Sequence, residues 1–242
     1  MANFILNERK GDGTYITINR ADVNGIVSDE MASELAGMID AAGKVSKFIV
    51  YRSAGADFCI GRDRGANPYA PPKEALQFRE NSETIFGFYD AFRRSPIPVI
   101  GAVQGRALGF GCAVAALCDI TIASDDARFA LPEMGHNIMP TIAMSALVDR
   151  VGRKGILYLA YSTREIDAAT ALGYGLVSLM VPRTKLDEEV EHVTKALTKA
   201  PLPAVLAAKE YAGVALSMDV RSASAYAKNL HATINTSPRM RE

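Results

Sequence analysis

The chain has 242 residues, of which 49% are hydrophobic and 22% charged, so it is long enough for a substantial core and has the composition of an ordinary folded protein. Its 27 Lys and Arg residues balance 27 Asp and Glu residues, whereas proteins that bind nucleic acid usually carry a basic excess. We therefore expect no nucleic-acid partner. The N-terminus lacks the long apolar segment of a signal peptide, and no window reaches the roughly 18 apolar residues of a membrane span. These features predict a cytoplasmic protein without a membrane partner.

The first half of the sequence alternates between strand and helix patterns. Residues 14–20 alternate apolar and polar side chains, and residues 47–53 form a more continuous apolar strand. Between them, residues 28–43 begin with a serine cap, repeat apolar residues at helical spacing and close with Gly43, which predicts an amphipathic helix. A glycine-containing loop, a second helix and a third core strand follow at residues 53–72, 73–94 and 96–105.

The second half is mostly helical. Residues 119–131 read as two short strands around an acidic turn, and residues 176–182 are the later strand-like stretch. Helical spacing is found at residues 142–152, 153–162, 166–175, 185–200 and 203–216. The sequence thus predicts an α/β core over residues 1–182 and a helical region of the same domain over residues 183–242.

The histidines and cysteines do not form a metal-binding pattern. His136, His192 and His231 are scattered without ligand spacing, so we expect no metal site. The cysteines sit among apolar residues, as reduced and buried thiols of a cytosolic protein do. These are Cys59, Cys112 and Cys118.

The stretch "GRALGFGCAVAALCDI" (residues 105–120) has the order strand, glycine turn, helix, which aims backbone N–H groups at negative charge. It fits neither common phosphate motif. Gly109 and Gly111 match the first two glycines of a dinucleotide fingerprint, but Val114 replaces the third, and a P-loop glycine and lysine are also missing. No Lys or Arg lies in "CAVAALC", which favours a charge that develops transiently on a carbonyl oxygen. The alternative is a turn that only lets strand and helix pack closely.

A second glycine loop, "GADFCIGRDRG" (residues 55–65), follows the strand at residues 47–53 in the same way. Two such loops can each point an N–H inward and form a two-donor oxyanion hole. Downstream, Glu133 lies between a proline and an apolar segment in "RFALPEMGHNIMP". A buried carboxylate there would have a raised pKa and serve as a proton carrier. The alternative is a solvated turn residue.

Together, these segments resemble the enoyl-CoA hydratase/isomerase (crotonase) family. "GADFCIGRD" is similar to its F-x-x-G-x-D loop, "PVIGAVQGRALGFGCAVAALCDITIASDDARFALPEMG" to its strand, glycine turn and helix, and "ALGYGLVSLMVP" to its A-x-x-x-G-L-V segment. The resemblance covers nearly the whole chain. It implies a crotonase-like (ClpP/crotonase) α/β fold, a stack of ββα units with a helical C-terminal region, assembled as a homotrimer or a dimer of trimers.

The resemblance also implies roles for particular residues. The two backbone N–H donors of the oxyanion hole fall on Arg62 and Phe110, whose side chains are larger than the family's usual Ala or Gly. Coenzyme A would enter as part of the acyl-CoA substrate, with no separate cofactor. Arg62 and Arg64 are candidates to meet the phosphates of CoA. The residues expected to bind CoA or substrate are Gly61, Asp63, Arg64, Gly65, Gly109 and Gly111.

Of the family's two catalytic carboxylates, one falls on Glu133 and the other on Ala113, where it is missing. Hydratases of the family use two glutamates to hold a water, whereas isomerases need one base that moves a proton from C2 to C4. The resemblance therefore favours an enoyl-CoA isomerase with Glu133 as acid–base. Hydration is the alternative, with His136 a weaker candidate for the missing group. A CoA-binding or scaffold protein that has lost activity is an alternative of another class.

The predicted helix over residues 75–92 is expected to line the acyl pocket. Its Phe86, Phe88 and Tyr89 would favour an apolar or aromatic acyl group, although such residues suit a protein core equally well.

Overall fold

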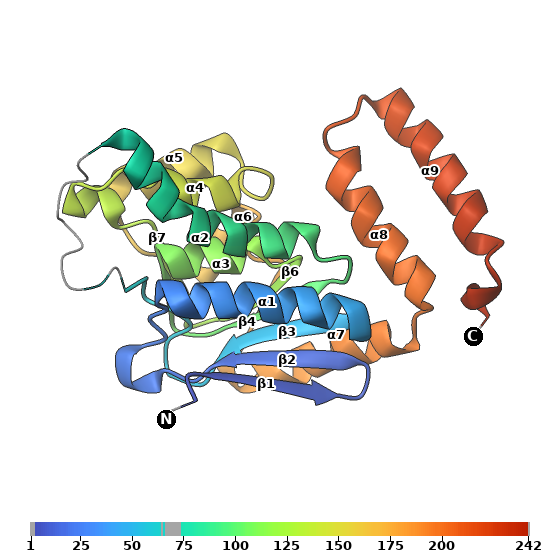
Figure 1. The fold of residues 1–242 in the computed structure, drawn as a ribbon, viewed down its shortest axis with the longest axis horizontal. Coiled ribbons are helices and arrows are strands. Elements are labelled where there is room, and N and C mark those ends of the chain that lie inside the picture. The colour runs from blue at the N-terminus through green and yellow to red at the C-terminus, as the bar shows by residue number, and fades with distance from the viewer. Residues whose placement is uncertain (1–2, 64, 66–73, 242) are drawn as a thin grey trace.

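The computed structural model describes residues 3–63, 65 and 74–241 of the chain. Its larger sheet has, within these residues, six strands in the order β1-β2-β3-β4-β6-β9 (Figure 1). The strands β1 and β2 form an antiparallel hairpin, and every later neighbour in the sheet is parallel. The strand bounds are Ile5–Lys10, Gly13–Ile18, Phe48–Ser53, Val99–Val103, Ile120–Ser124 and Leu179–Val181.

A smaller sheet stands beside the carboxyl ends of the central strands. In the described part of the chain it consists of β5 (Arg106–Leu108), β7 (Arg128–Ala130) and β8 (Ile166–Asp167). β5 is parallel to β7, and β7 is antiparallel to β8. The two strands predicted around the acidic turn at residues 119–131 are confirmed as β6 and β7.

Helices cross over between the parallel strands, as parallel pairing requires. The helices α1 and α2 lead into β3 and β4, and α3 leads into β6. The α-helices of the described residues are Asp29–Val45, Ala75–Arg94, Phe110–Leu117, Thr141–Leu147, Arg153–Ser162, Ala168–Gly173, Leu186–Lys199, Leu202–Ala215 and Val220–Asn235, numbered α1 to α9 in this order. Short 3-10 helices lie at Ala21–Val23, Glu133–His136, Arg183–Lys185 and Pro238–Met240 (η1 to η4).

The helix α1 shows how local sequence sets these elements. The Ser28 hydroxyl accepts a hydrogen bond from Met31 N at 3.3 Å, so the predicted serine cap is confirmed. Leu35 and Ile39 repeat at helical spacing and are fully buried. The prediction that Gly43 ends the helix is wrong, because α1 continues to Val45. Gly43 instead lets α1 lie close to Pro96, since a Cβ on Gly43 would be 3.0 Å from Pro96 Cδ.

Both faces of the central sheet are covered. Residues such as Ile49 and Tyr51 of β3 point into the large core shared with α1, α2 and α3. Alternate residues point to the opposite face, where they pack on the apolar side of α7; this second cluster comprises Phe48, Val50, Ile100, Ala102, Ile122, Leu186 and Val190. Burial on two faces explains why the strand at residues 47–53 reads as a continuous apolar run.

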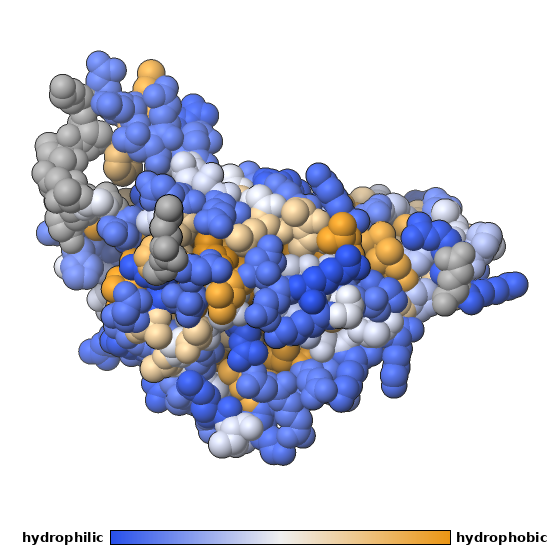
Figure 2. Space-filling model, turned by 60° about the horizontal axis from the view of Figure 1, so that its bottom comes forward, coloured by the Kyte–Doolittle hydropathy of each residue, from blue (hydrophilic) through white to orange (hydrophobic). Residues whose placement is uncertain are grey.

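The last two helices extend away from this body as an antiparallel pair (Figure 1). In α9, every residue of which the structure describes, no side chain is buried, and α8 buries Val205 and Ala207. Lys209 ties α8 to the core, because its Nζ donates to Asp119 Oδ2 at 2.7 Å and to the Ile97 carbonyl at 2.9 Å. The face of the molecule seen in Figure 2 is largely hydrophilic, with hydrophobic areas between the polar side chains.

Candidate active site

The two glycine loops predicted to cooperate lie side by side. Cys59, in the loop after β3, forms a parallel bridge with Ala107 of β5. The Cys59 N–H donates to the Arg106 carbonyl at 3.1 Å, and the Leu108 N–H donates to the Cys59 carbonyl at 2.9 Å. The start of α3 also rests on this loop, since a Cβ on Gly111 would lie 2.0 Å from the Cys59 carbonyl oxygen. Backbone contact therefore joins the loop of Arg62 to the turn of Phe110.

The Asp57 side chain also holds the loop after β3 to the start of β5. Asp57 accepts hydrogen bonds from Arg106 N at 2.8 Å and from Arg106 Nη2 at 2.8 Å. The side-chain hydrogen bond from Arg106 lowers the pKa of Asp57, although partial burial opposes it. Asp57 and Arg106 belong to different segments of the chain and form no motif, so no signal in the sequence pairs them.

The backbone of Arg62 is held by the segment before α1. The Val27 N–H donates to the Gly61 carbonyl at 3.4 Å, and the Asp63 N–H donates to the Val27 carbonyl at 2.9 Å. Because neighbouring residues of an extended segment point their N–H groups to opposite sides, the Arg62 N–H points away from Val27.

The side chain of Arg62 turns to the first residue of α1. Its Nε lies 2.9 Å from Asp29 Oδ1, and the Arg62 side chain is only 17% exposed. The ion pair thus holds this guanidinium at the N-terminus of α1. A contact of Arg62 with CoA phosphates would have to be made from this position or would have to break the ion pair. Arg64, the other arginine expected to meet phosphate, lies outside the described residues. The Asp63 carboxylate accepts a hydrogen bond from Gly65 N at 2.9 Å and so shapes the loop.

Gly109 makes the turn from β5 into α3. Its φ of 53° and ψ of −110° lie in a region that side-chain-bearing residues rarely adopt. Its N–H donates to the Ala130 carbonyl at 2.9 Å, and its own carbonyl accepts from Ala113 N at 3.0 Å. Phe110 is then the first residue of the helix, where a backbone N–H has no acceptor within the helix and lies at the positive end of the helix dipole.

Glu133 reaches this same turn from a distant part of the chain. It begins η2 directly after Pro132, and a Cβ on Gly109 would lie 2.9 Å from Glu133 Oε1. The residue is half-buried, and its Oε2 atom is fully buried. The structure therefore brings Glu133, Gly109 and Phe110 together.

The charge of the Glu133 carboxylate raises the pKa of buried groups around it. Burial raises the pKa of the Tyr89 hydroxyl well above its ordinary value, the negative charge of Glu133 raises it further, and the positive charge of Arg62 opposes this. Burial and the charge of Glu133 also raise the pKa of the Cys112 thiol. Tyr89 and Cys112 thus lie within electrostatic reach of Glu133.

The structure also places Ala113 and His136. Ala113 is completely buried in α3 and presents only a methyl group at the position where the resemblance puts the family's second carboxylate. His136, at the end of η2, is exposed to solvent.

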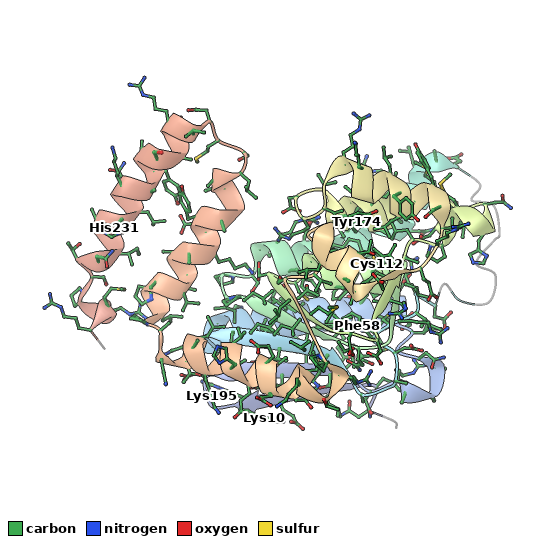
Figure 3. All side chains as sticks on the ribbon, turned by 180° about the vertical axis from the view of Figure 1, so that it is seen from behind. Lys10, Phe58, Cys112, Tyr174, Lys195 and His231 are labelled. Carbon is green, nitrogen blue, oxygen red and sulfur yellow. The ribbon has the colours of Figure 1, made fainter. Side chains whose placement is uncertain are left out.

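The expected buried thiols are confirmed. Cys59, Cys112 and Cys118 are unpaired and buried, and burial raises the pKa of Cys59 to about 12. Figure 3 shows Cys112 and Phe58 inside the body of the molecule, whereas His231 lies out on α9. Among the described residues, no group of three or more His, Cys, Asp and Glu side chains is placed to hold a metal ion. None of the helices in the described part of the chain is both long and apolar enough to cross a membrane.

Comparison with known proteins gives consistent matches. A sequence profile of the family described as enoyl-CoA hydratase/isomerase matches residues 9–241. A "Probable enoyl-CoA hydratase" of Rhizobium meliloti is 31% identical over 93% of this chain and 87% of its own. The "Short-chain-enoyl-CoA hydratase" of Clostridium acetobutylicum is 29% identical over 93% and 86%. The crystal structure of an enoyl-CoA hydratase from Mycobacterium smegmatis superposes with a TM-score of 0.90 at 26% identity, covering 98% of this chain and 93% of that one.

Proposed function

The chain belongs to the enoyl-CoA hydratase/isomerase family, and we propose that it binds an acyl-CoA and stabilises the enolate of its thioester. The predicted crotonase-like α/β fold with a helical C-terminal region is confirmed by the structural match. In this proposal the thioester oxygen accepts hydrogen bonds from the backbone N–H groups of Arg62 and Phe110. Glu133 exchanges a proton with the adjacent carbon.

The chemistry explains why these groups are needed together. A thioester α-proton is too weakly acidic for a free carboxylate to remove efficiently. Two N–H donors that meet the oxygen as charge develops on it stabilise the enolate by about 3 kcal/mol each. The single observation that carries the proposal is the contact between Glu133 and Gly109, because it puts the carboxylate beside the residue that precedes the Phe110 N–H.

We propose isomerisation as the reaction. Glu133 would remove a proton from C2 of a 3-enoyl-CoA, the enolate would delocalise over C2 to C4, and the protonated Glu133 would return the proton to C4 to give the 2-enoyl-CoA. The reaction needs no water and no second acid–base. Ala113 supports this choice, since its buried methyl group cannot hold a nucleophilic water.

Hydration of a 2-enoyl-CoA is the second candidate. It is favoured by the names of the relatives from Rhizobium meliloti and Clostridium acetobutylicum, both of which are called enoyl-CoA hydratases. In this reaction Glu133 would orient the attacking water with help from a group other than Ala113. His136, which follows Glu133 closely in the sequence, is the weaker candidate for this group.

A non-catalytic CoA-binding or scaffold protein is the candidate of another class. The presence of Glu133 together with both glycine loops argues against it, since a carboxylate beside the two proposed N–H donors serves proton transfer and is not needed for binding CoA alone.

The test is proton exchange at C2 of a saturated acyl-CoA in D₂O, which requires the enolate but neither isomerisation nor hydration. We expect the wild type to exchange the proton and Glu133→Gln to lose at least 100-fold of that rate. Glu34→Gln, the same change at an exposed position of α1, is the matched control and should exchange like the wild type. Equal exchange by Glu133→Gln and the wild type would rule out the base assignment.

Product analysis then separates the two reactions. Incubation with 3-enoyl-CoA should give 2-enoyl-CoA if the protein is an isomerase. Incubation with 2-enoyl-CoA in H₂¹⁸O should give labelled 3-hydroxyacyl-CoA if it is a hydratase. A protein that binds acyl-CoA without exchange or turnover would match the non-catalytic candidate.

We also propose that the chain assembles as a homotrimer or a dimer of trimers in the cytoplasm, and that it uses CoA only as part of its substrate. The support for assembly is the α8–α9 pair, which extends from the body and exposes Leu216 and Val220 at 78% and 85%. Light scattering should give the mass of three or six chains; the mass of one chain would contradict the assembly.

A further inference from the structure

The side chain of Phe110 closes the space between α3 and α2. Its ring stacks on Phe88 with centroids 5.6 Å apart and an interplanar angle of 17°, and it lies 6.0 Å from the ring of Tyr89. Phe88 and Tyr89 are 0% and 1% exposed, and Phe110 is 7% exposed. Phe110 is also the residue whose backbone N–H we propose as a donor to the thioester oxygen. Its ring therefore fills the interior directly behind that N–H.

These rings belong to a continuous aromatic wall. The ring contacts run on from Phe88 to Phe92, from Phe92 to Tyr51 and from Tyr51 to Phe58, with centroids 5.2, 5.7 and 6.0 Å apart. Phe58 immediately precedes Cys59, in the loop that also carries Arg62. The aromatic wall (Tyr51, Phe58, Phe88, Tyr89, Phe92 and Phe110) thus connects the two loops that carry the proposed donors.

The wall is closely packed and uncharged. Its members other than Phe110 are at most 2% exposed, so there is no room among them for added carbon atoms without displacing a ring. Tyr89 carries a hydroxyl near Glu133, but burial and that negative charge keep its pKa far above neutrality. Phe110, at 7% exposed, is therefore the member of the wall that can meet a bound acyl group, and the other rings support it from behind.

We propose that Phe110 is a specificity-determining residue that restricts the enzyme to short, apolar acyl groups. This rests on the proposed function, which puts the thioester oxygen at the Phe110 N–H and C2 beside Glu133. The ring and the proposed N–H donor belong to the same residue, so the ring borders the first acyl carbons. Carbons further along the acyl chain that head towards α2 meet the Phe110 ring and the wall behind it.

The experiment compares acyl-CoAs of four, six, eight and ten carbons. Their saturated forms are titrated calorimetrically, which needs no turnover, and kcat/KM is measured with the matching enoyl-CoAs. We expect the wild type to prefer four or six carbons over ten by about tenfold or more. Phe110→Ala should raise the relative affinity for eight and ten carbons by about tenfold. Phe110→Leu, which keeps more of the volume, should give a smaller change in the same direction.

Phe48→Leu is the matched control. Phe48 is also buried, but it packs on the opposite face of the sheet with α7, so its truncation should leave the length preference unchanged. A wild type that binds four and ten carbons equally, or a Phe110→Leu variant with unchanged preference, would overturn the length limit and leave the proposed function standing. Length-dependent binding without exchange or turnover would support the limit while overturning the proposed reaction. If no acyl-CoA binds, both proposals fail.

Discussion

The carboxylate of Glu133 lies against Gly109, close enough that a methyl group on that glycine would be 2.9 Å from Glu133 Oε1. Gly109 also has a φ of 53° and a ψ of −110°, which an alanine adopts only under strain. Gly109→Ala should therefore displace both Glu133 and the Phe110 N–H. We expect the rate of C2 proton exchange to fall at least 100-fold and the free energy of unfolding to fall by about 1–3 kcal/mol.

The matched control for that change is Gly37→Ala. Gly37 is an exposed position within α1, and a Cβ there would meet nothing within 4 Å. We expect this variant to exchange at the wild-type rate and to gain about 0.5–1 kcal/mol of stability, measured by urea denaturation. Wild-type exchange by Gly109→Ala would show that the turn does not position the site.

A second prediction concerns the ion pair between Arg62 Nε and Asp29 Oδ1 at 2.9 Å. If it positions the Arg62 N–H, Asp29→Asn should reduce C2 exchange several-fold, mainly in kcat. It should cost no more than about 1 kcal/mol of stability, because the Asp29 side chain is 38% exposed. Arg62→Lys should retain more activity than Arg62→Ala. Asp22→Asn, which removes the exposed partner of the Arg20–Asp22 pair, is the control, and equal kcat in both Asn variants would argue against positioning.

A third prediction is a pH dependence of stability due to Asp57. Hydrogen bonding from Arg106 lowers the pKa of this carboxylate in the folded state. Its stabilising contribution should be complete above its unfolded pKa of about 3.9 and be lost as the pH falls through the lower folded value. The difference in unfolding free energy between the wild type and Asp57→Asn, on the order of 1–2 kcal/mol, should stay constant from about pH 5 to 8 and shrink below about pH 4. If the difference in unfolding free energy at pH 2 is as large as at pH 7, the hydrogen-bonded Asp57 carboxylate is not its origin.

A fourth prediction concerns the attachment of α8. Lys209 Nζ donates to Asp119 Oδ2 and to the carbonyls of Ile97 and Phe92, and its side chain is 14% exposed. Lys209→Ala leaves these acceptors without their donor, at a cost of about 1–3 kcal/mol. Hydrogen exchange of the α8 amides should accelerate, while exchange in β3 and β4 should change little. Lys228→Ala, at an exposed position of α9, should leave α8 unchanged; equal protection of α8 in the two variants would refute the role of Lys209.

The residues that carry local patterns could be predicted from the sequence. The cap at Ser28, the apolar repeat of α1 and the buried strands β3 and β4 follow from propensity and periodicity, and the structure has them close to the expected bounds. The glycine turn before α3 was also anticipated, although the short strand β5 within it was not. Its three residues are too few to show a period.

The elements that were missed lack such a pattern. β1 has one buried residue, Ile5, followed by polar ones, because it forms the edge of the sheet and pairs with β2 alone. α9 lies within the helical region predicted over residues 183–242, but its bounds were not predicted, and none of its residues, all of which are described, is buried.

At the site, the sequence could indicate Glu133 and the two glycine loops, but not how they meet. The contact of Glu133 with Gly109 depends on the parallel pairing of β5 with β7, which puts Gly109 and the start of η2 at the same end of the smaller sheet. The partners Asp29 and Asp57 occupy unremarkable positions in sequence, and only tertiary folding pairs them with Arg62 and Arg106.

The bridge between Cys59 and Ala107 has a thermodynamic consequence. Because main-chain hydrogen bonds join the two loops, the conformational entropy of ordering both is lost when the chain folds, before any ligand arrives. The two donors are then preorganised, and a ligand with an enolate-like oxygen meets a geometry that needs little rearrangement. Such a mimic should bind with a smaller entropic penalty than it would to two independently mobile loops.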